Sequence, residues 1–158
     1  MAASRVPAAI ALGSNLGDRE AHLDFAVERL RRLLEPLRLS QLIETEPVDV
    51  PDVQASFLNG VAIGETSLTP SDLLAALLAI ERERGRQRPH RHAARTLDLD
   101  LILYGDWVVN EPGLSVPHPR FRERRFVLAP LAEVAGDWLD PVTGKTVSAL
   151  LRSLPRPS

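Results

Sequence analysis

The 158-residue sequence predicts a fold of the α+β class. Two segments with apolar residues at helical spacing alternate with four strand-like segments, in the order β-α-β-β-α-β. Short turns separate these segments, and no repeat or linker divides the chain. This order predicts a ferredoxin-like antiparallel sheet with helices on one face, plus a C-terminal hairpin and helices. We expect residues 1–158 to form a single domain whose tail, 153–158, is frayed.

The first half of the chain is predicted to supply three strands and one helix. Residues 6–12 (VPAAIAL) form the first strand, and GSNLGD turns the chain into a helix over about 18–34, which Asn15 or Asp18 can cap. Its apolar stripe consists of Leu23, Val27, Leu30 and Leu34. Segments 37–46 and 57–67 are expected to be the second and third strands, with a proline-broken loop between them.

The second half begins with a strong helix start. Thr69 is the expected N-cap, Pro70 occupies the first helical position, and Gly85 can end the helix. Residues 86–95 are a basic loop, and 96–104 are the fourth strand. A hairpin over Trp107–Val116 and helical segments near 126–135 and 146–152 complete the chain.

Two aspartates, Asp98 and Asp100, interrupt the apolar fourth strand, TLDLDLILY. Side chains alternate in a strand, so both aspartates share a face with Ile102 and Tyr104, with Cα atoms about 6.5–7 Å apart. The opposite, core-facing row would consist of Leu97, Leu99, Leu101 and Leu103. Because neighbouring carboxylates repel each other, a cation must offset their charge or one pKa must rise. The cation is either Mg²⁺ shared with a polyphosphate or a nearby arginine on a solvated face.

Arginines are concentrated just before this strand. They lie on the predicted helix end and the basic loop, at Arg82, Arg84, Arg86, Arg88, Arg91 and Arg95. A basic loop beside an acidic strand favours a metal–polyphosphate site, because guanidinium groups hold the phosphate oxygens that metals leave open. The alternative is a solvated charge cluster that supports the helix C-terminus, which suits Arg82 and Arg91.

Composition excludes several other classes of function. The net charge of −2 disfavours a general nucleic-acid or membrane binder, and the absence of cysteine excludes disulfides, thiolate metal sites and a cysteine nucleophile. No segment reads as a signal peptide or membrane span, so we expect a cytoplasmic protein. DPVTGKT lacks the first Walker glycine because position 139 is Leu139, and LGSNLG has Asn15 where a dinucleotide fingerprint has glycine.

Four motifs in this order carry a specific resemblance: LGSNLGD, FLNGV at 57–61, RTLDLDLILYG at 95–105 and VPHPRFRERRFVLAPLAE at 116–133. From about residue 8 to 152 the chain resembles the 6-hydroxymethyl-7,8-dihydropterin pyrophosphokinase family. The resemblance implies a ferredoxin-like fold and a kinase of folate biosynthesis, which transfers the terminal diphosphate of ATP to the pterin hydroxymethyl oxygen and releases AMP. We also expect a monomer that acts on small-molecule substrates, ATP and hydroxymethyldihydropterin, and has no nucleic-acid or membrane partner.

The resemblance assigns roles to individual residues. Two Mg²⁺ ions are expected on Asp98 and Asp100, which would act in catalysis together with Arg86 and Arg95. The residues expected to bind ATP are Glu81, Arg86, Arg88, Arg95, Leu101, His118 and Arg124. The residues expected to bind pterin are Thr45, Pro47, Val48, Phe57, Asn59, Asp98 and Phe126.

The chemistry of these residues fits the implied roles. Two aromatic faces can hold a flat ring, and an amide offers both a donor and an acceptor to its edge. Ordinary core packing remains the alternative for Phe57 and Phe126, and a structural role in a proline turn for His118. The sequence departs from the family at 92–94, where His-Ala-Ala replaces Trp-Gly-Pro, and at Gly113 and Pro119. The loop is also about one residue short, which shifts the alignment of its arginines.

Two other classes of function stay open at this point. A regulatory ferredoxin-like module would bind a small ligand without Mg²⁺ and without chemistry. A metal-dependent phosphatase or nucleotidyl hydrolase would use the same aspartate pair and need no pterin.

Overall fold

The computed structural model describes residues 4–45, 56–84 and 96–155. Its centre is an antiparallel sheet of β1 (Val6–Ser14), β2 (Glu35–Leu39), β3 (Ile43–Thr45), β4 (Phe57–Thr66) and β5 (Asp98–Tyr104). The order is β2-β4-β1-β5, and β3 pairs with β4 along the same edge as β2. The first and last strands are therefore neighbours, as the predicted β-α-β-β-α-β order requires.

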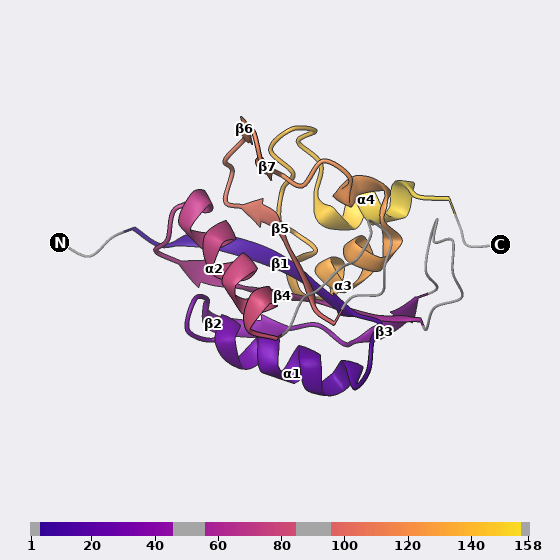
Figure 1. Cartoon of the computed structure of the whole chain (residues 1–158). Helices are drawn as coiled ribbons and strands as arrows, with labels where there is room; N and C mark the ends of the chain where they lie inside the picture. The colour runs from indigo at the N-terminus through magenta and orange to yellow at the C-terminus, as the bar shows by residue number, and fades with distance from the viewer. Residues whose placement is uncertain (1–3, 46–55, 85–95, 156–158) are drawn as a thin grey trace.

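Helices cover both faces of this sheet (Figure 1). The first face carries α1 (Arg19–Leu30) and α2 (Pro70–Glu83), and the second carries α3 (Arg125–Ala135) and α4 (Val147–Ser153). Each face therefore has its own apolar core, built from alternate residues of the central strands. The ferredoxin-like helices lie on one face as expected, and the C-terminal helices add the second layer.

The predicted helix starts are confirmed by their caps. The side chain of Asp18 accepts a hydrogen bond from the backbone N–H of Ala21 at 3.1 Å, and that of Thr69 accepts one from Asp72 at the same distance. The helix predicted over 18–34 ends earlier, at Leu30, and a turn follows it. Leu34 remains fully buried in the first core, so its apolar character reflects packing outside the helix.

The single strand predicted over 37–46 is wrong, because the structure divides it into β2 and β3. The interruption is at Ser40, which is buried and bonds to the neighbouring strand through both its backbone and its side chain. Its backbone N–H donates to the Val61 carbonyl, while its hydroxyl accepts from the Val61 N–H, each at 2.9 Å. A side-chain oxygen thus takes the place of a backbone acceptor in the ladder, and the strand is interrupted there.

The predicted alternation of β5 holds only as far as Leu101. The pairing with β1 shifts register there, since Ala9 is opposite Leu103 and Ile10 is opposite Leu101. Ile102 is thus an extra residue, and a bulge of this kind reverses the faces that follow. Leu103 therefore lies in the second core and Tyr104 in the first, which corrects the predicted row of four leucines.

The C-terminal part begins with the expected hairpin, β6 (Val109–Glu111) and β7 (Leu114–Val116), which turns at Gly113 with φ of 78°. A 3₁₀ turn at Phe121–Glu123 leads into α3. DPVTGKT is a capped turn between α3 and α4, in which Asp140 bonds to Val142 and Thr143. The GKT sequence therefore serves this turn, consistent with its exclusion as a Walker loop.

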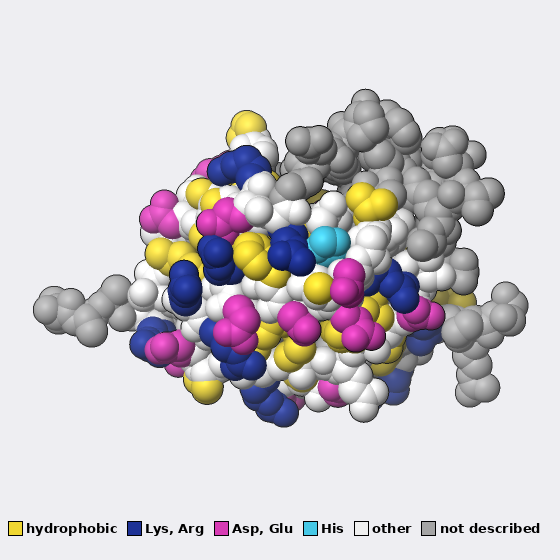
Figure 2. Space-filling view, turned by 60° about the horizontal axis from the view of Figure 1, so that its bottom comes forward, with side chains coloured by type: hydrophobic (Ala, Val, Ile, Leu, Met, Phe, Trp, Pro, Cys, Tyr) yellow, Lys and Arg dark blue, Asp and Glu magenta, His cyan; other side chains and the backbone are white. Residues whose placement is uncertain are grey.

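On the face around α1, acidic and basic side chains are interspersed without a patch of one sign (Figure 2). None of the helices in the described ranges combines the length and apolar character that a membrane crossing requires.

Candidate active site

Three strands contribute one row of residues to the second face of the sheet. In this row Asn59 of β4 is opposite Gly13 of β1, and Gly13 is in turn opposite Asp98 of β5. A Cβ atom added to Gly13 would lie 2.6 Å from Oδ1 of Asn59. The amide of Asn59 therefore occupies the space above Gly13, on the same face as Asp98, because directly opposed residues share a face.

The pterin-binding residues predicted from β3 and β4 meet beside this row. The Asn59 side-chain Nδ2 donates a hydrogen bond to the Thr45 hydroxyl at 2.6 Å, and the buried amide is only 7% exposed. Phe57 is paired with Thr45 and, two residues before Asn59, projects to the same face. The structure thus brings Thr45, Phe57, Asn59 and Asp98 to one end of one face.

Phe126 comes from the helical layer that covers this second face of the sheet. It lies in the first turn of α3, is half-buried and packs against the second core. The Arg124 guanidinium lies over its ring, 5.7 Å from the centroid. A predicted phosphate ligand and a predicted ring-stacking residue are thus in contact, which places them in the same region of the molecule.

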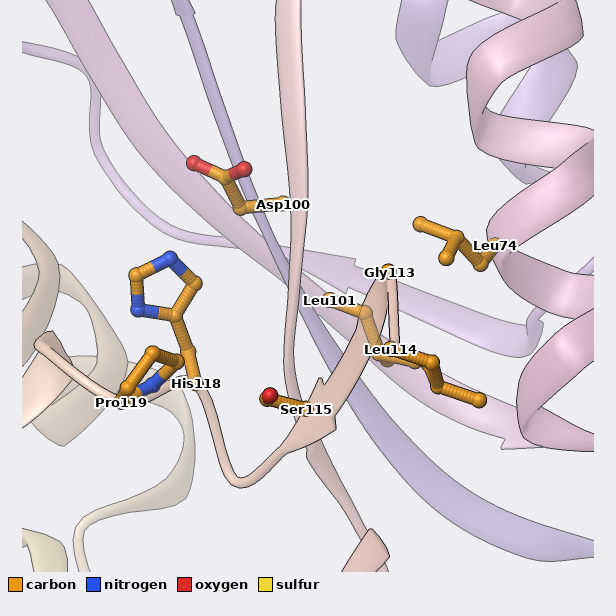
Figure 3. A pocket seen from close by; sticks show the side chains of 8 residues that line it. All are labelled: Leu74, Asp100, Leu101, Gly113, Leu114, Ser115, His118 and Pro119. Atoms are coloured by element: carbon orange, nitrogen blue, oxygen red, sulfur yellow. The ribbon is translucent and has the colours of Figure 1, made fainter. Parts of the chain in front are cut away.

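A cavity of about 270 Å³ lies across the edge strand β5. Figure 3 shows the carboxylate of Asp100 and the imidazole of His118 on one side of this strand, and Leu74, Leu101 and Leu114 on the other. The cavity therefore has a polar side and an apolar side. Such a division suits a ligand with a charged end and a flat apolar end.

His118 owes its place to the bulge in β5. Its backbone N–H donates to the carbonyl of Ile102, the bulged residue, at 2.9 Å. Its Nδ1 accepts a hydrogen bond from the Arg120 N–H at 3.1 Å, so the neutral ring carries its proton on Nε2. Burial first, and Arg124 second, lower the pKa of His118 to about 4, while Asp98 opposes the shift. At neutral pH the side chain is thus an uncharged Nε2–H donor.

Glu81 and Leu101 are both expected near ATP. Glu81 contacts β5 from α2, and Leu101 is part of β5. Glu81 is buried on α2, and its Oε2 accepts a hydrogen bond from the Leu99 N–H at 2.7 Å. This carboxylate therefore anchors the strand between the two aspartates. Leu101, two residues further on, lines the cavity.

The remaining predicted site residues lie outside the described ranges. These are Pro47 and Val48 of the expected pterin loop, the arginines Arg86, Arg88 and Arg95, and His92.

The two aspartates are half-buried on one face, an arrangement that suits a hard divalent cation. No group of three or more histidine, aspartate or glutamate side chains able to hold a metal occurs within the three described ranges. Mg²⁺ uses one or two protein carboxylates and completes its shell with substrate phosphates and water. A pair of carboxylates, one of which lines the cavity, has the chemistry of such a site.

Comparison with known proteins shows which family the chain represents. Residues 9–136 match the family described as 7,8-dihydro-6-hydroxymethylpterin-pyrophosphokinase (HPPK). The chain belongs to this family. It is 43% identical over 148 residues to the Pseudomonas aeruginosa 2-amino-4-hydroxy-6-hydroxymethyldihydropteridine pyrophosphokinase, covering 92% of this chain and 90% of the relative. The Bacillus subtilis enzyme of the same name is 47% identical over 127 residues, covering 79% and 75%.

Membership of this pyrophosphokinase family makes the chain an ATP-dependent diphosphotransferase. Its fold is also that of the HPPK part of Plasmodium falciparum HPPK-DHPS, with a TM-score of 0.74 and 14% identity. The match covers 96% of this chain and 45% of that one, so the chain spans less than half of the solved protein. The likeness confirms the predicted fold class.

Sequence reasoning missed several residues that the structure places at the site. Gly13 carries no side chain, and its place under the Asn59 amide depends on strand register. Leu74, Leu114 and Ser115 line the cavity from α2 and β7. In the sequence the two leucines look like ordinary core residues, and Ser115 lies in a three-residue strand.

Proposed function

We propose that this protein transfers the terminal diphosphate of ATP to the hydroxymethyl group of 6-hydroxymethyl-7,8-dihydropterin, in folate biosynthesis. A bond forms between the hydroxymethyl oxygen and the β-phosphorus, the bond from that phosphorus to the α-bridging oxygen breaks, and AMP leaves. The hydroxyl proton is lost, and Asp98 is the nearest candidate to accept it. The observation that carries the proposal is the two-sided cavity across β5, adjoining the row of Asn59, Gly13 and Asp98.

In this proposal the nucleotide lies with its base and sugar on the apolar side of the cavity and its phosphates on the polar side. Leu74, Leu101 and Leu114 offer an apolar wall to the base and sugar, while Asp100 and His118 lie where the phosphates would follow. The neutral His118 ring donates from Nε2 to a phosphate oxygen, and Arg124 adds a charged donor nearby. In this proposal Arg86, Arg88 and Arg95 supply the remaining phosphate contacts.

The pterin occupies the end of the same face. Because its Nδ2 bonds to Thr45, the Asn59 side chain is fixed in one orientation and presents its carbonyl oxygen and second N–H to the ring edge. Phe57 and Phe126 hold the two ring faces, and Pro47 and Val48 contact the ring from the loop. The hydroxymethyl group then points along the row toward Asp98.

Two Mg²⁺ ions held by Asp98 and Asp100 complete the proposal. When bound, Mg²⁺ offsets charge on the phosphate oxygens and lowers the pKa of the attacking hydroxyl. The hydrogen bond from the Leu99 N–H to Glu81 holds the aspartate strand in place. Most of the rate enhancement then comes from positioning and from charge around the α- and β-phosphates.

One assay separates this proposal from the alternatives. Incubation with ATP, Mg²⁺ and hydroxymethyldihydropterin should give AMP and pterin diphosphate in equal amounts. A hydrolase would release phosphate or diphosphate from ATP without the pterin. A sensor module would bind a ligand without Mg²⁺ and form no AMP. Either result would refute the proposal.

We also propose that the chain is a single domain that acts as a monomer in the cytoplasm. The two apolar cores share one sheet, which supports a single cooperative unit. Sedimentation at working concentration tests the monomer, and one unfolding transition tests the single domain.

A further inference from the structure

Arg19 joins the two chain segments that precede and follow residues 46–55. Its Nη1 donates to the Ser56 carbonyl at 2.8 Å, and its Nη2 donates to Oε1 of Glu44 at 2.5 Å. Glu44 belongs to β3, which precedes this segment, and Ser56 directly precedes β4, which follows it. One guanidinium group thus binds both stems of the segment that holds Pro47 and Val48.

The position of Arg19 is itself well defined. It is the first residue of α1, directly after the capping residue Asp18. Its side chain is 26% exposed, so the guanidinium is partly shielded from water. A planar guanidinium that donates to two different acceptors fixes the distance between these acceptors better than a flexible ammonium could.

The contacts of Arg19 lie one residue from the proposed pterin contacts. Glu44 precedes Thr45, and Ser56 precedes Phe57, and Thr45 and Phe57 are the last pair of the β3–β4 ladder. β3 has only three residues and lies at the edge of the sheet, so its ladder alone holds it weakly. Glu44 projects to the α1 side and Thr45 to the opposite side, toward Asn59.

We propose that Arg19 is a positioning residue for the pterin: it holds Glu44 and Ser56 at a fixed separation, so that the adjacent Thr45 and Phe57 meet the ring with Asn59 already oriented. The inference rests on the proposed function for the identity of the ligand. Arg19 does not touch substrate in this role. Its loss therefore raises the KM for the pterin while the KM for Mg-ATP and kcat stay close to the wild-type values.

Three substitutions and a control test this role in the full-length enzyme. Arg19→Gln removes both contacts and should raise the pterin KM about tenfold. Arg19→Lys keeps the charge and can hold one acceptor well, so its effect should be intermediate. Glu44→Gln leaves the Ser56 contact intact and should have a smaller effect. The control Arg5→Gln breaks a comparable exposed pair with Glu35, at the opposite end of β1, and should leave both KM values unchanged.

Two of these substitutions change the net charge in opposite directions. They therefore distinguish the loss of the contact from a change in the long-range attraction of a charged substrate. Arg19→Gln lowers the net charge and Glu44→Gln raises it, so a rise of the pterin KM in both variants points to the lost contact. Unchanged pterin KM in Arg19→Gln, or equal losses for ATP and pterin, would overturn the proposal.

Hydrogen exchange in the ligand-free protein tests the stems without any assay of activity. The amides of Thr45 and Phe57 should exchange faster in Arg19→Gln than in the wild type, and unchanged exchange would show that Arg19 does not hold the stems. If the wild type forms no pterin diphosphate, the proposed function fails, and with it the KM effect. If the wild type is active and Arg19→Gln keeps its pterin KM, only the role of Arg19 fails.

Discussion

Asn59 and Asp98 lie on the same face of the sheet, separated only by Gly13. Neighbouring strands are about 4.8 Å apart, so the two residues are on strands separated by roughly 10 Å. A flat ligand held at the Asn59 amide can therefore extend over Gly13 and bring a substituent to Asp98. Strand register thus sets the distance between the proposed recognition group and the proposed catalytic group.

A methyl group at Gly13 should interfere with the pterin alone. In Gly13→Ala the new Cβ would lie 2.6 Å from Asn59 Oδ1, so the amide must move and its bond to Thr45 must weaken. We expect the pterin KM to rise by about tenfold or more, because a misplaced amide forfeits its hydrogen bonds to the ring. The KM for Mg-ATP serves as the internal control, and an equal rise there would contradict this assignment.

A larger side chain in the cavity should impair the binding of Mg-ATP and leave the binding of pterin unchanged. Leu74 forms part of the apolar wall from α2, away from the pterin face. In Leu74→Trp the larger ring occupies space proposed for the nucleotide, so the KM for Mg-ATP should rise by roughly tenfold or more while the pterin KM is unchanged. Leu78 of the same helix is exposed, and Leu78→Trp is the matched control. Normal ATP affinity in Leu74→Trp would place the nucleotide elsewhere.

Removing one carboxylate charge should separate the metal role from folding. Asp100→Asn keeps the shape of the side chain but removes the charge that a hard cation requires. We expect turnover to fall by about 1,000-fold or more while the fold is retained, because the substitution changes the charge of the side chain and not its shape. Calorimetry adds a second measurement, since nucleotide binding should lose its dependence on Mg²⁺. Retention of most Mg²⁺-dependent activity would refute the role.

The sequence predicted features that depend on local pattern. Strand alternation placed Asp98 and Asp100 on one face, and the capping residues Asp18 and Thr69 marked the helix starts. These features follow from a few adjacent side chains, and the structure has each of them.

Features that depend on distant contacts could not be read in the same way. The bulge in β5 is stabilised by a hydrogen bond from His118 to Ile102, and the break between β2 and β3 depends on Ser40 and Val61. The Arg19 contacts reach residues 25 and 37 positions further along the chain. Nothing in the neighbourhood of Arg19 indicates these partners, because its side chain looks like any exposed arginine in the first turn of a helix.

His118 should make stability depend on pH between its two pKa values. In the unfolded chain it binds a proton near pH 6.5, but burial first, and Arg124 second, lower the folded pKa to about 4. The unfolded state therefore binds more protons in this window, so the free energy of unfolding falls as pH drops from 6.5 toward 4. Protonation would also cost the hydrogen bond that Nδ1 accepts from Arg120.

The comparison with His118→Gln isolates this contribution. Denaturant unfolding of the metal-free proteins at pH 7.5 and 5 should show a larger loss in the wild type than in the variant. His22, whose pKa is also lowered, by burial first and then by Arg84, is present in both proteins and cancels. Parallel losses in the two proteins would show that His118 is not buried as described.

Arg122 and Asp140 form the ion pair that fastens the turn between α3 and α4. Burial alone would raise the pKa of the fully buried Asp140 carboxyl, but hydrogen bonds from Arg122, Thr143 and Val142 lower it to about 2. The contribution of this carboxylate to stability is thus present above its unfolded pKa of 3.8 and is lost as pH falls toward 2. Arg122→Met leaves a buried charge without its cation and should cost about 3 kcal/mol in the free energy of unfolding at pH 7.

The conservative change Asp140→Asn should cost less than Arg122→Met. The amide keeps the shape of the side chain and can still accept from Val142, while Arg122, which is 24% exposed, can turn to water. Both variants should also differ from the wild type in acid. Arg122→Met removes the hydrogen bond that lowers the pKa of Asp140 below its unfolded value, so its stability should fall less in acid than that of the wild type, and Asp140→Asn has no carboxyl to titrate there. Urea unfolding from pH 7 to 3 measures both effects, and an equal cost for the two variants would mean that the pair contributes through packing alone.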